Sequence, residues 1–92
     1  MSERYTRTLE IVNERGLHAR ASAKVVELSE RYSCDATISY NGERADPRSL
    51  MDLLTLVASK GVFVTVDAEG EDATDYLDAL ETLIAGRFGE KA

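Results

Sequence analysis

Alternation of apolar and polar residues predicts three half-buried strands, over residues 8–12, 34–40 and 62–68. Each run has one apolar face, which is typical of a sheet with one covered side and one solvent-exposed side. The Asn-Gly pair directly after the second run is a strong signal for a tight hairpin turn. The short and polar residues 43–46 then form the returning strand, which we expect at an edge of the sheet.

Helical spacing of apolar residues predicts three helices, over residues 19–32, between Ser49 and Gly61, and from Glu71 to Gly86. Ser49 can cap the second helix, and Asp52, three residues on, resembles the partner in a capping box. The apolar positions of this second helix, which we expect mostly in the core, are Leu50, Leu53, Leu54, Val57 and Ala58.

The predicted order is therefore strand, helix, strand, strand, helix, strand, helix. Helices on one face of an antiparallel sheet give a two-layer α+β domain. The chain has 92 residues, enough for one modest core, so we interpret residues 1–92 as a single domain. Periodicity does not fix the strand order, and a ferredoxin-like arrangement shares the first six elements.

The charge of the chain argues against two classes of partner, and its apolar runs and single cysteine indicate where it is located. The chain carries 11 basic and 17 acidic residues, a net charge of −6, which argues against nucleic acid and anionic membrane surfaces as partners. Its apolar runs are far too short to span a bilayer. Cys34, the single cysteine, cannot form an internal disulfide and is expected to be an inert core thiol. We therefore expect a cytoplasmic protein.

The only histidine, His18, follows a glycine turn and begins an alanine-rich helical pattern. Free N–H groups and the positive end of the helix dipole favour an anion at a helix N-terminus. A neutral imidazole has one ring nitrogen free to attack phosphorus, and Arg20 adds a positive fork suited to phosphate oxygens. The pattern predicts a histidine that accepts and passes on a phosphoryl group. The alternatives are a capping histidine and a solvated arginine.

Other kinds of chemistry have no support in the sequence. No glycine-rich nucleotide loop of the form GxxxxGK[ST] occurs, so the phosphoryl group must come from another protein. We expect no cofactor, no metal and no turnover of a substrate of its own. The carboxylates expected on the solvated side of the third helix, without a histidine or cysteine beside them, are Asp72, Asp75, Asp78 and Glu81.

Residues 16–20 (GLHAR) resemble the active-site motif of the HPr family, the histidine phosphocarriers of the bacterial phosphotransferase system. Residues 49–51 (SLM) resemble the regulatory-serine segment of that family. The resemblance extends from about Tyr5 to Phe88. It implies an open-faced β-sandwich, in which a four-stranded antiparallel sheet carries three helices on one face.

The resemblance also implies roles and partners. Enzyme I, charged by phosphoenolpyruvate, would phosphorylate His18 on Nδ1, Arg20 would steady the phosphate, and an enzyme IIA domain would receive the group. In lineages that have the HPr kinase/phosphorylase, that enzyme would phosphorylate Ser49 and slow phosphorylation of His18. A carrier that alternates between partners is expected to be a monomer. The implied partner face includes Leu17, Ala19, Leu50, Met51 and Leu54.

One position departs from the family pattern: Ala21 stands where proline usually follows the arginine. Alanine is an excellent helix residue, so the fold is not affected. Alanine at this position is similar to nitrogen-related versions of the system, and Glu27 and Glu30 make the first helix acidic where sugar-transport carriers often have lysines. The sequence leaves both the sugar-transport and the nitrogen-related branch open.

Two rival functions use parts of the same pattern. The first is a non-catalytic regulatory or ligand-binding module of ferredoxin-like type, which gives no reason for His18 and Arg20 at a helix start. The second is an acyl carrier with its serine at Ser49, but that fold is an all-helical bundle and the predicted strands contradict it.

Overall fold

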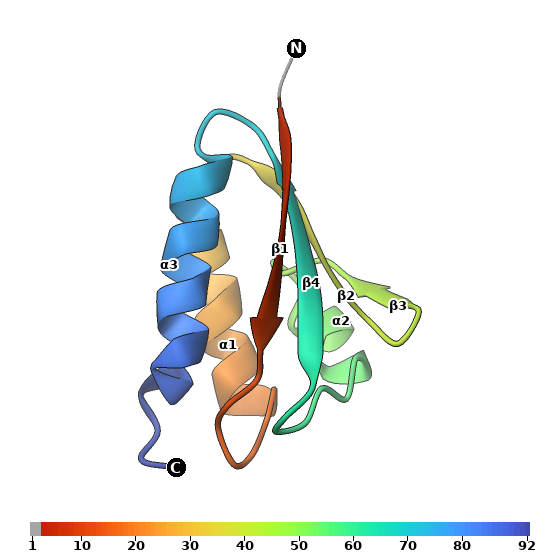
Figure 1. Cartoon of the computed structure of the whole chain (residues 1–92), viewed down its shortest axis with the longest axis vertical. Coiled ribbons are helices and arrows are strands. Elements are labelled where there is room, and N and C mark those ends of the chain that lie inside the picture. The colour runs from red at the N-terminus through yellow and green to blue at the C-terminus, as the bar shows by residue number, and fades with distance from the viewer. Residues whose placement is uncertain (1–2) are drawn as a thin grey trace.

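The computed structural model of the chain describes residues 3–92 (Figure 1). Within this range the elements follow the predicted order. The strands are β1 (Arg4–Glu10), β2 (Asp35–Tyr40), β3 (Glu43–Ala45) and β4 (Phe63–Glu69). The helices are α1 (Ala19–Ser29), α2 (Leu50–Thr55) and α3 (Ala73–Ala85), followed by a 3-10 turn, η1 (Arg87–Gly89).

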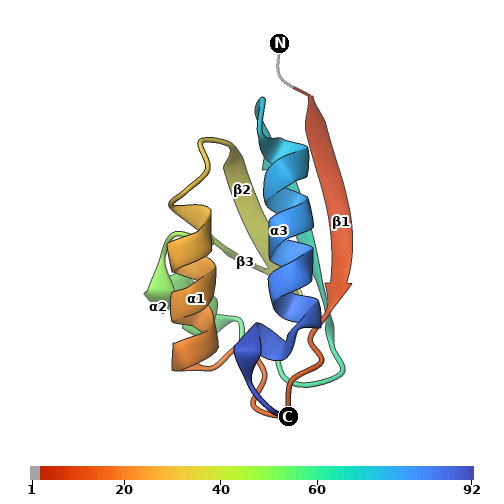
Figure 2. The same cartoon turned by 90° about the vertical axis from the view of Figure 1, so that its left-hand side faces the viewer.

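The strands form one antiparallel sheet in the order β1-β4-β2-β3, with β3 at an edge as predicted. Asn41 and Gly42 join β2 to β3 with φ angles of 52° and 82°, the left-handed conformation of a tight hairpin turn. The helices cover one face of the sheet and leave the other open (Figures 1 and 2). The predicted α+β class with an open-faced sheet is confirmed.

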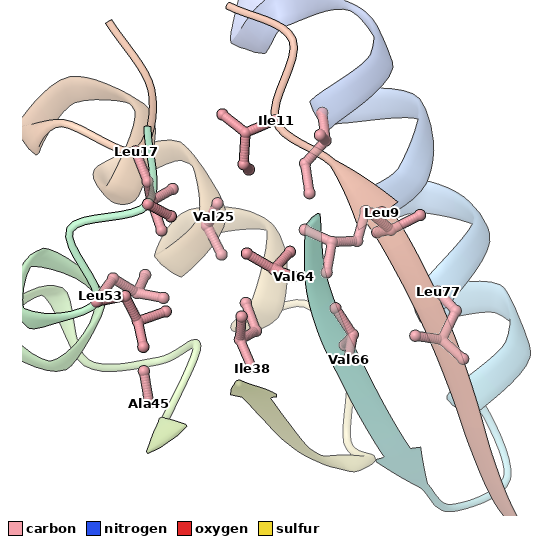
Figure 3. Close-up of a cluster of buried hydrophobic side chains, with 14 of the residues drawn as sticks. Leu9, Ile11, Leu17, Val25, Ile38, Ala45, Leu53, Val64, Val66 and Leu77 are labelled. Atoms are coloured by element: carbon pink, nitrogen blue, oxygen red, sulfur yellow. The ribbon is translucent and has the colours of Figure 1, made fainter. Parts of the chain in front are cut away.

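The core lies between the sheet and this helical layer. Val64 and Val66 of the central strand β4 are no more than 1% exposed and point toward α1 and α3 (Figure 3). Leu9 and Ile11, predicted to point inward, are also buried. Burial of apolar side chains of this size stabilises the fold by roughly 1.5–3 kcal/mol each.

The first strand begins at Arg4, four residues before the predicted start. Its early part pairs fully with β4, from Arg4 opposite Glu69 to Glu10 opposite Phe63. The alternation is concealed by Arg7, which occupies an inward position and pairs with Asp78 (2.7 Å) and Glu81 (3.0 Å) on α3. Both carboxylates are exposed on the solvated side of α3, as expected, and they also join this helix to the sheet.

The second helix ends at Thr55, well before the predicted Gly61, and this prediction was wrong. Leu53 is fully buried, but Leu50, Leu54 and Val57 are 40%, 36% and 77% exposed, so much of the predicted apolar stripe lies at the surface. The chain turns away because Val57 adopts a left-handed φ of 52°. Residues 56–62 then lead into β4.

The first helix ends at Ser29, not at the predicted Tyr32. Ser29 is buried and its hydroxyl lies 2.6 Å from the Tyr76 hydroxyl of α3, while the Tyr32 ring packs edge-on against Tyr76. Asp72 was expected to be solvated, but its carboxylate accepts hydrogen bonds from the backbone N–H groups of Ser33 and Cys34. The start of α3 therefore fixes the connection from α1 to β2.

Cys34 is 2% exposed, and burial raises the pKa of its thiol. Among residues 3–92, no cluster of three or more histidine, cysteine or acidic side chains could hold a metal ion. No helix in the same range is both long and apolar enough to cross a bilayer.

Candidate functional site

A glycine turn positions the histidine loop. Gly16 has a φ of 63°, and a Cβ there would lie 2.5 Å from the carbonyl oxygen of Ala58 and 2.8 Å from the Cα of Ser59. The next residue, Leu17, donates its backbone N–H to the same Ala58 carbonyl (2.8 Å). The loop before α1 is thus held against the loop after α2.

His18 is the N-cap of α1, and the helix begins at Ala19 as predicted. Its extended backbone (φ −79°, ψ −176°) lets its carbonyl accept the first helical hydrogen bond, from Ser22 N–H (2.8 Å). The ring itself performs the capping, because Nδ1 accepts the backbone N–H of Arg20 at 3.3 Å. A histidine that caps the helix and a histidine that could accept a phosphoryl group therefore require the same position of the ring, so the two interpretations do not exclude each other.

The opposite ring nitrogen, Nε2, lies 2.5 Å from Oε2 of Glu90. The other oxygen of that carboxylate, Oε1, accepts a hydrogen bond from Asn13 Nδ2 at 2.9 Å. Glu90 follows η1, and the C-terminal segment returns to the loop between β1 and α1 (Figure 2). Residues more than 70 positions apart in sequence thus form one hydrogen-bonded cluster around the ring.

These contacts determine which ring nitrogen carries the proton when His18 is neutral. Because Nδ1 accepts from a backbone N–H, the single proton of the neutral ring lies on Nε2 and is donated to Glu90. The hydrogen bond from Asn13, followed by that from His18, lowers the pKa of Glu90. The carboxylate is therefore ionised at neutral pH, and the nitrogen with the free electron pair is Nδ1.

Arg20 lies on the first turn of α1 with its side chain exposed. Among the described residues it makes no side-chain hydrogen bond or ion pair, which leaves its guanidinium free to receive an anion. The hollow that it shares with His18 is lined by Glu14, Arg15, His18, Arg20, Glu90, Lys91 and Ala92. Its lining holds three basic side chains, which suit a phosphoryl group, together with the acidic Glu14 and Glu90.

A second hollow joins His18 to the end of α2. It is lined by Arg15, Leu17, His18, Leu54, Val57, Ala58 and Ser59. The structure thus brings Leu54 beside the histidine, whereas Leu17 is only 7% exposed and mainly contributes to the core. Leu50 and Met51 are exposed on α2 but do not line this hollow, and Ala19 is exposed at the start of α1.

Ser49 is the N-cap of α2, and its hydroxyl accepts the backbone N–H of Asp52 at 3.2 Å, as predicted. The reciprocal half of a capping box is absent from this helix start. The Asp52 carboxylate accepts the N–H of Asp46 (3.1 Å), while the N–H of Ser49 donates to the Asp46 carbonyl (2.9 Å). Ser49 lines neither hollow around His18.

Sequence reasoning missed Asn13 and Glu90. Asn13 is 0% exposed and directly follows the strand predicted over residues 8–12, while Glu90 lies beyond the last helical pattern. A buried polar side chain signals a specific hydrogen-bond partner, but periodicity gives no sign that this asparagine is buried. The contact of Glu90 with both His18 and Asn13 depends on the tertiary path of the last residues.

An ionised carboxylate at one ring nitrogen, an electron pair on the other and the Arg20 side chain beside them are features expected of a histidine that accepts a phosphoryl group. The comparisons with known proteins agree with this interpretation. Residues 5–86 match the family model described as the PTS HPr component phosphorylation site. The chain belongs to the HPr family, the phosphocarriers of the phosphotransferase system.

Individual relatives cover nearly the whole chain. The phosphocarrier protein HPr of Cupriavidus necator is 44% identical over 80 residues, which is 87% of this chain and 90% of that protein. The HPr of Pseudomonas aeruginosa is 42% identical over 81 residues, again 87% and 90% of the two chains. The crystal structure of HPr from Thermoanaerobacter tengcongensis has a TM-score of 0.91 at 33% identity and covers 96% of this chain and 99% of that one.

Proposed function

We propose that residues 1–92 form a single phosphocarrier domain that accepts a phosphoryl group on His18 from phosphorylated enzyme I and transfers it to an enzyme IIA domain. The observation that carries this proposal is the hydrogen bonding of the ring. Nε2 faces Glu90 and Nδ1 faces the backbone N–H at the start of α1, so phosphorus bonded to Nδ1 would meet helix N–H groups. Arg20 would bind the phosphate oxygens.

Intact mass after mixing the chain with phosphoenolpyruvate and enzyme I of the same organism tests this function. We expect a gain of one phosphate that is lost in acid. His18→Asn is the matched variant, because asparagine retains an N-cap acceptor while removing the nucleophile. A phosphate gain by a folded His18→Asn variant would contradict the assignment, as would no gain by the wild type with an enzyme I proven active on another acceptor.

We place the docking surface for enzyme I and the enzyme IIA domain on the apolar hollow beside His18 and on the exposed side of α2. Leu54 is 36% and Met51 is 71% exposed, and methionine adapts to more than one partner. Leu54→Ser should raise the KM for this carrier in the enzyme I reaction without a change in fold. Phe63→Ser, which removes an apolar side chain that is 59% exposed outside the hollow, is the control.

We propose regulation at Ser49 by a serine kinase of the HPr kinase/phosphorylase type. A phosphate at the N-cap of α2 can be accommodated by the helix start, while it adds negative charge on the proposed docking helix. Ser49→Asp should therefore slow phosphorylation of His18 by enzyme I, and Ser49→Ala should leave that rate close to wild type. Equal rates for the aspartate and alanine variants would reduce Ser49 to a helix cap.

A further inference from the structure

Glu90 occupies the place next to His18 that an orienting carboxylate takes beside a reactive histidine. We propose that Glu90 is a positioning residue for phosphoryl transfer: it keeps the ring proton on Nε2, leaves Nδ1 as the nucleophile and balances the positive charge of the phosphorylated ring. This inference rests on the proposed function, since it assigns a role within the same reaction.

The carboxylate is held through both of its oxygens. Oε2 faces His18 Nε2 at 2.5 Å and Oε1 accepts from Asn13 Nδ2 at 2.9 Å. The side chains of His18 and Glu90 are only 24% and 17% exposed, so the contact is shielded from most competing water. An arrangement of this kind restricts the rotation of an imidazole and determines which ring nitrogen carries the proton of the neutral form.

Asn13 fixes the direction of this hydrogen bonding. Its Nδ2 also donates to the carbonyl oxygen of Gly16 at 2.8 Å, so both protons of the amide have acceptors. Rotating the amide would place its oxygen against two other oxygens. Asn13 therefore donates an N–H to residue 90, and the side chain at position 90 must provide an oxygen that accepts this hydrogen bond.

The C-terminal segment is anchored in a way that delivers Glu90 to the ring. Phe88 is 0% exposed, and its carbonyl accepts a hydrogen bond from Lys24 Nζ on α1 at 2.5 Å. Arg87, Phe88 and Gly89 all have left-handed φ angles, 57°, 55° and 81°. Two such non-glycine residues in succession are costly and persist only where the surrounding contacts require them.

The chemistry explains what the carboxylate contributes. The Nδ1 electron pair forms the new bond to phosphorus while the bond from phosphorus to the donor breaks and its electron pair stays on the donor. The ring thereby gains one positive charge and keeps its proton on Nε2. That proton remains hydrogen-bonded to the negative Glu90, which stabilises the charged product and the transition state that leads to it.

Glu90→Gln makes a sharp test because Asn13 dictates how the glutamine sits. Its amide oxygen must face Asn13, so its NH₂ group faces His18 and requires the electron pair on Nε2. The ring proton then moves to Nδ1, which breaks the hydrogen bond from Arg20 N–H, and the nucleophile is lost. Ring ¹⁵N chemical shifts should show the Nε2–H form in the wild type, the Nδ1–H form in Glu90→Gln and a mixture in Glu90→Ala.

Rates of phosphoryl acceptance from enzyme I should follow the same order: wild type fastest, Glu90→Ala slower, and Glu90→Gln slowest by on the order of tenfold or more. A merely structural role predicts the reverse, because glutamine is the better mimic of glutamate's shape. Glu71→Gln, which removes the same charge from an exposed position, is the control.

Unchanged ring tautomers in Glu90→Gln, or an alanine variant slower than the glutamine variant, would overturn the inference. The ¹⁵N measurement requires no phosphorylation. Failure of the proposed function, seen as a wild type that accepts no phosphate, is therefore separable from failure of the role assigned to Glu90.

Discussion

At the scale of single residues, the site depends on how closely two loops approach. Gly16 and Ala58 belong to the loops before α1 and after α2, and the missing side chain of Gly16 allows their backbones to touch. The N–H of Leu17, hydrogen-bonded to Ala58, then sets where His18 emerges. The placement of the ring is therefore decided two residues earlier, by a glycine that takes no part in chemistry.

Gly16→Ala should destabilise the fold by about 1–3 kcal/mol, because it adds left-handed strain and a Cβ that meets rigid backbone. Urea unfolding measures the loss, and phosphoryl acceptance should fall with it. Gly42→Ala is the matched control: its φ is also left-handed, at 82°, but a Cβ there meets nothing within 4 Å. Equal losses for the two variants would remove the steric argument.

Asp72 makes the stability of the folded protein depend on pH. Hydrogen bonds from backbone N–H groups, that of Ser33 first, lower the pKa of its carboxyl below the usual 3.8. A pKa lowered by folding means that the stabilisation is complete above the unfolded value and disappears as pH falls through the folded value. Asp72→Asn should lower Tm at pH 7, and its difference from wild type should shrink below about pH 4. A difference independent of pH would contradict this origin.

At the scale of elements, α2 shows why a short helix needs its cap. Its six residues provide few internal hydrogen bonds, and Leu53 is the residue that it buries. Much of its apolar surface faces outward, so packing contributes less here than in α3. The helix therefore depends on Ser49 more than a longer amphipathic helix would depend on one residue.

Ser49→Ala should cost about 1 kcal/mol of folding stability, because the N–H of Asp52 loses its acceptor. Chemical denaturation provides the measurement. Ser39→Ala, at a half-buried serine of β2, is the control and should cost less. A loss no larger than that of the control would show that water replaces the cap.

Elements also show where prediction from sequence succeeds and where it stops. Alternation located β2 and β4, and the Asn-Gly turn located β3, the edge partner of β2, because these signals are local. Arg7 concealed the start of β1, since an inward arginine becomes favourable only once α3 supplies Asp78 and Glu81. His18 and Arg20 were predictable from their place at a helix start. Glu90 was not, because its partners come from the other end of the chain.

At the scale of the whole molecule, the C-terminal segment closes the core and completes the site. Phe88 fills the space beside α3 with a fully buried ring, and Glu90 two residues later reaches His18. Stability and chemistry are therefore coupled through this segment. A change that releases the aromatic ring also releases the carboxylate.

Phe88→Ala should destabilise the fold by about 3–5 kcal/mol through loss of buried surface and the cavity left behind. Ring ¹⁵N shifts of His18, measured well below the unfolding temperature, should also move toward a mixture of tautomers. Phe63→Ala, at a position 59% exposed, should change stability by no more than about 0.5 kcal/mol. Unaltered His18 shifts in a folded Phe88→Ala variant would show that the two roles are independent.

The position of the chain ends has a practical consequence for anyone who labels or fuses this protein. β1 starts at the end of the sheet remote from the histidine loop, whereas Lys91 and Ala92 line the hollow that His18 and Arg20 share (Figure 1). A purification tag or fluorescent fusion at the C-terminus would stand over the reactive ring and crowd incoming proteins. An addition ahead of β1 would join the described structure at the end of the sheet remote from this hollow, and is the safer design for any binding or turnover assay.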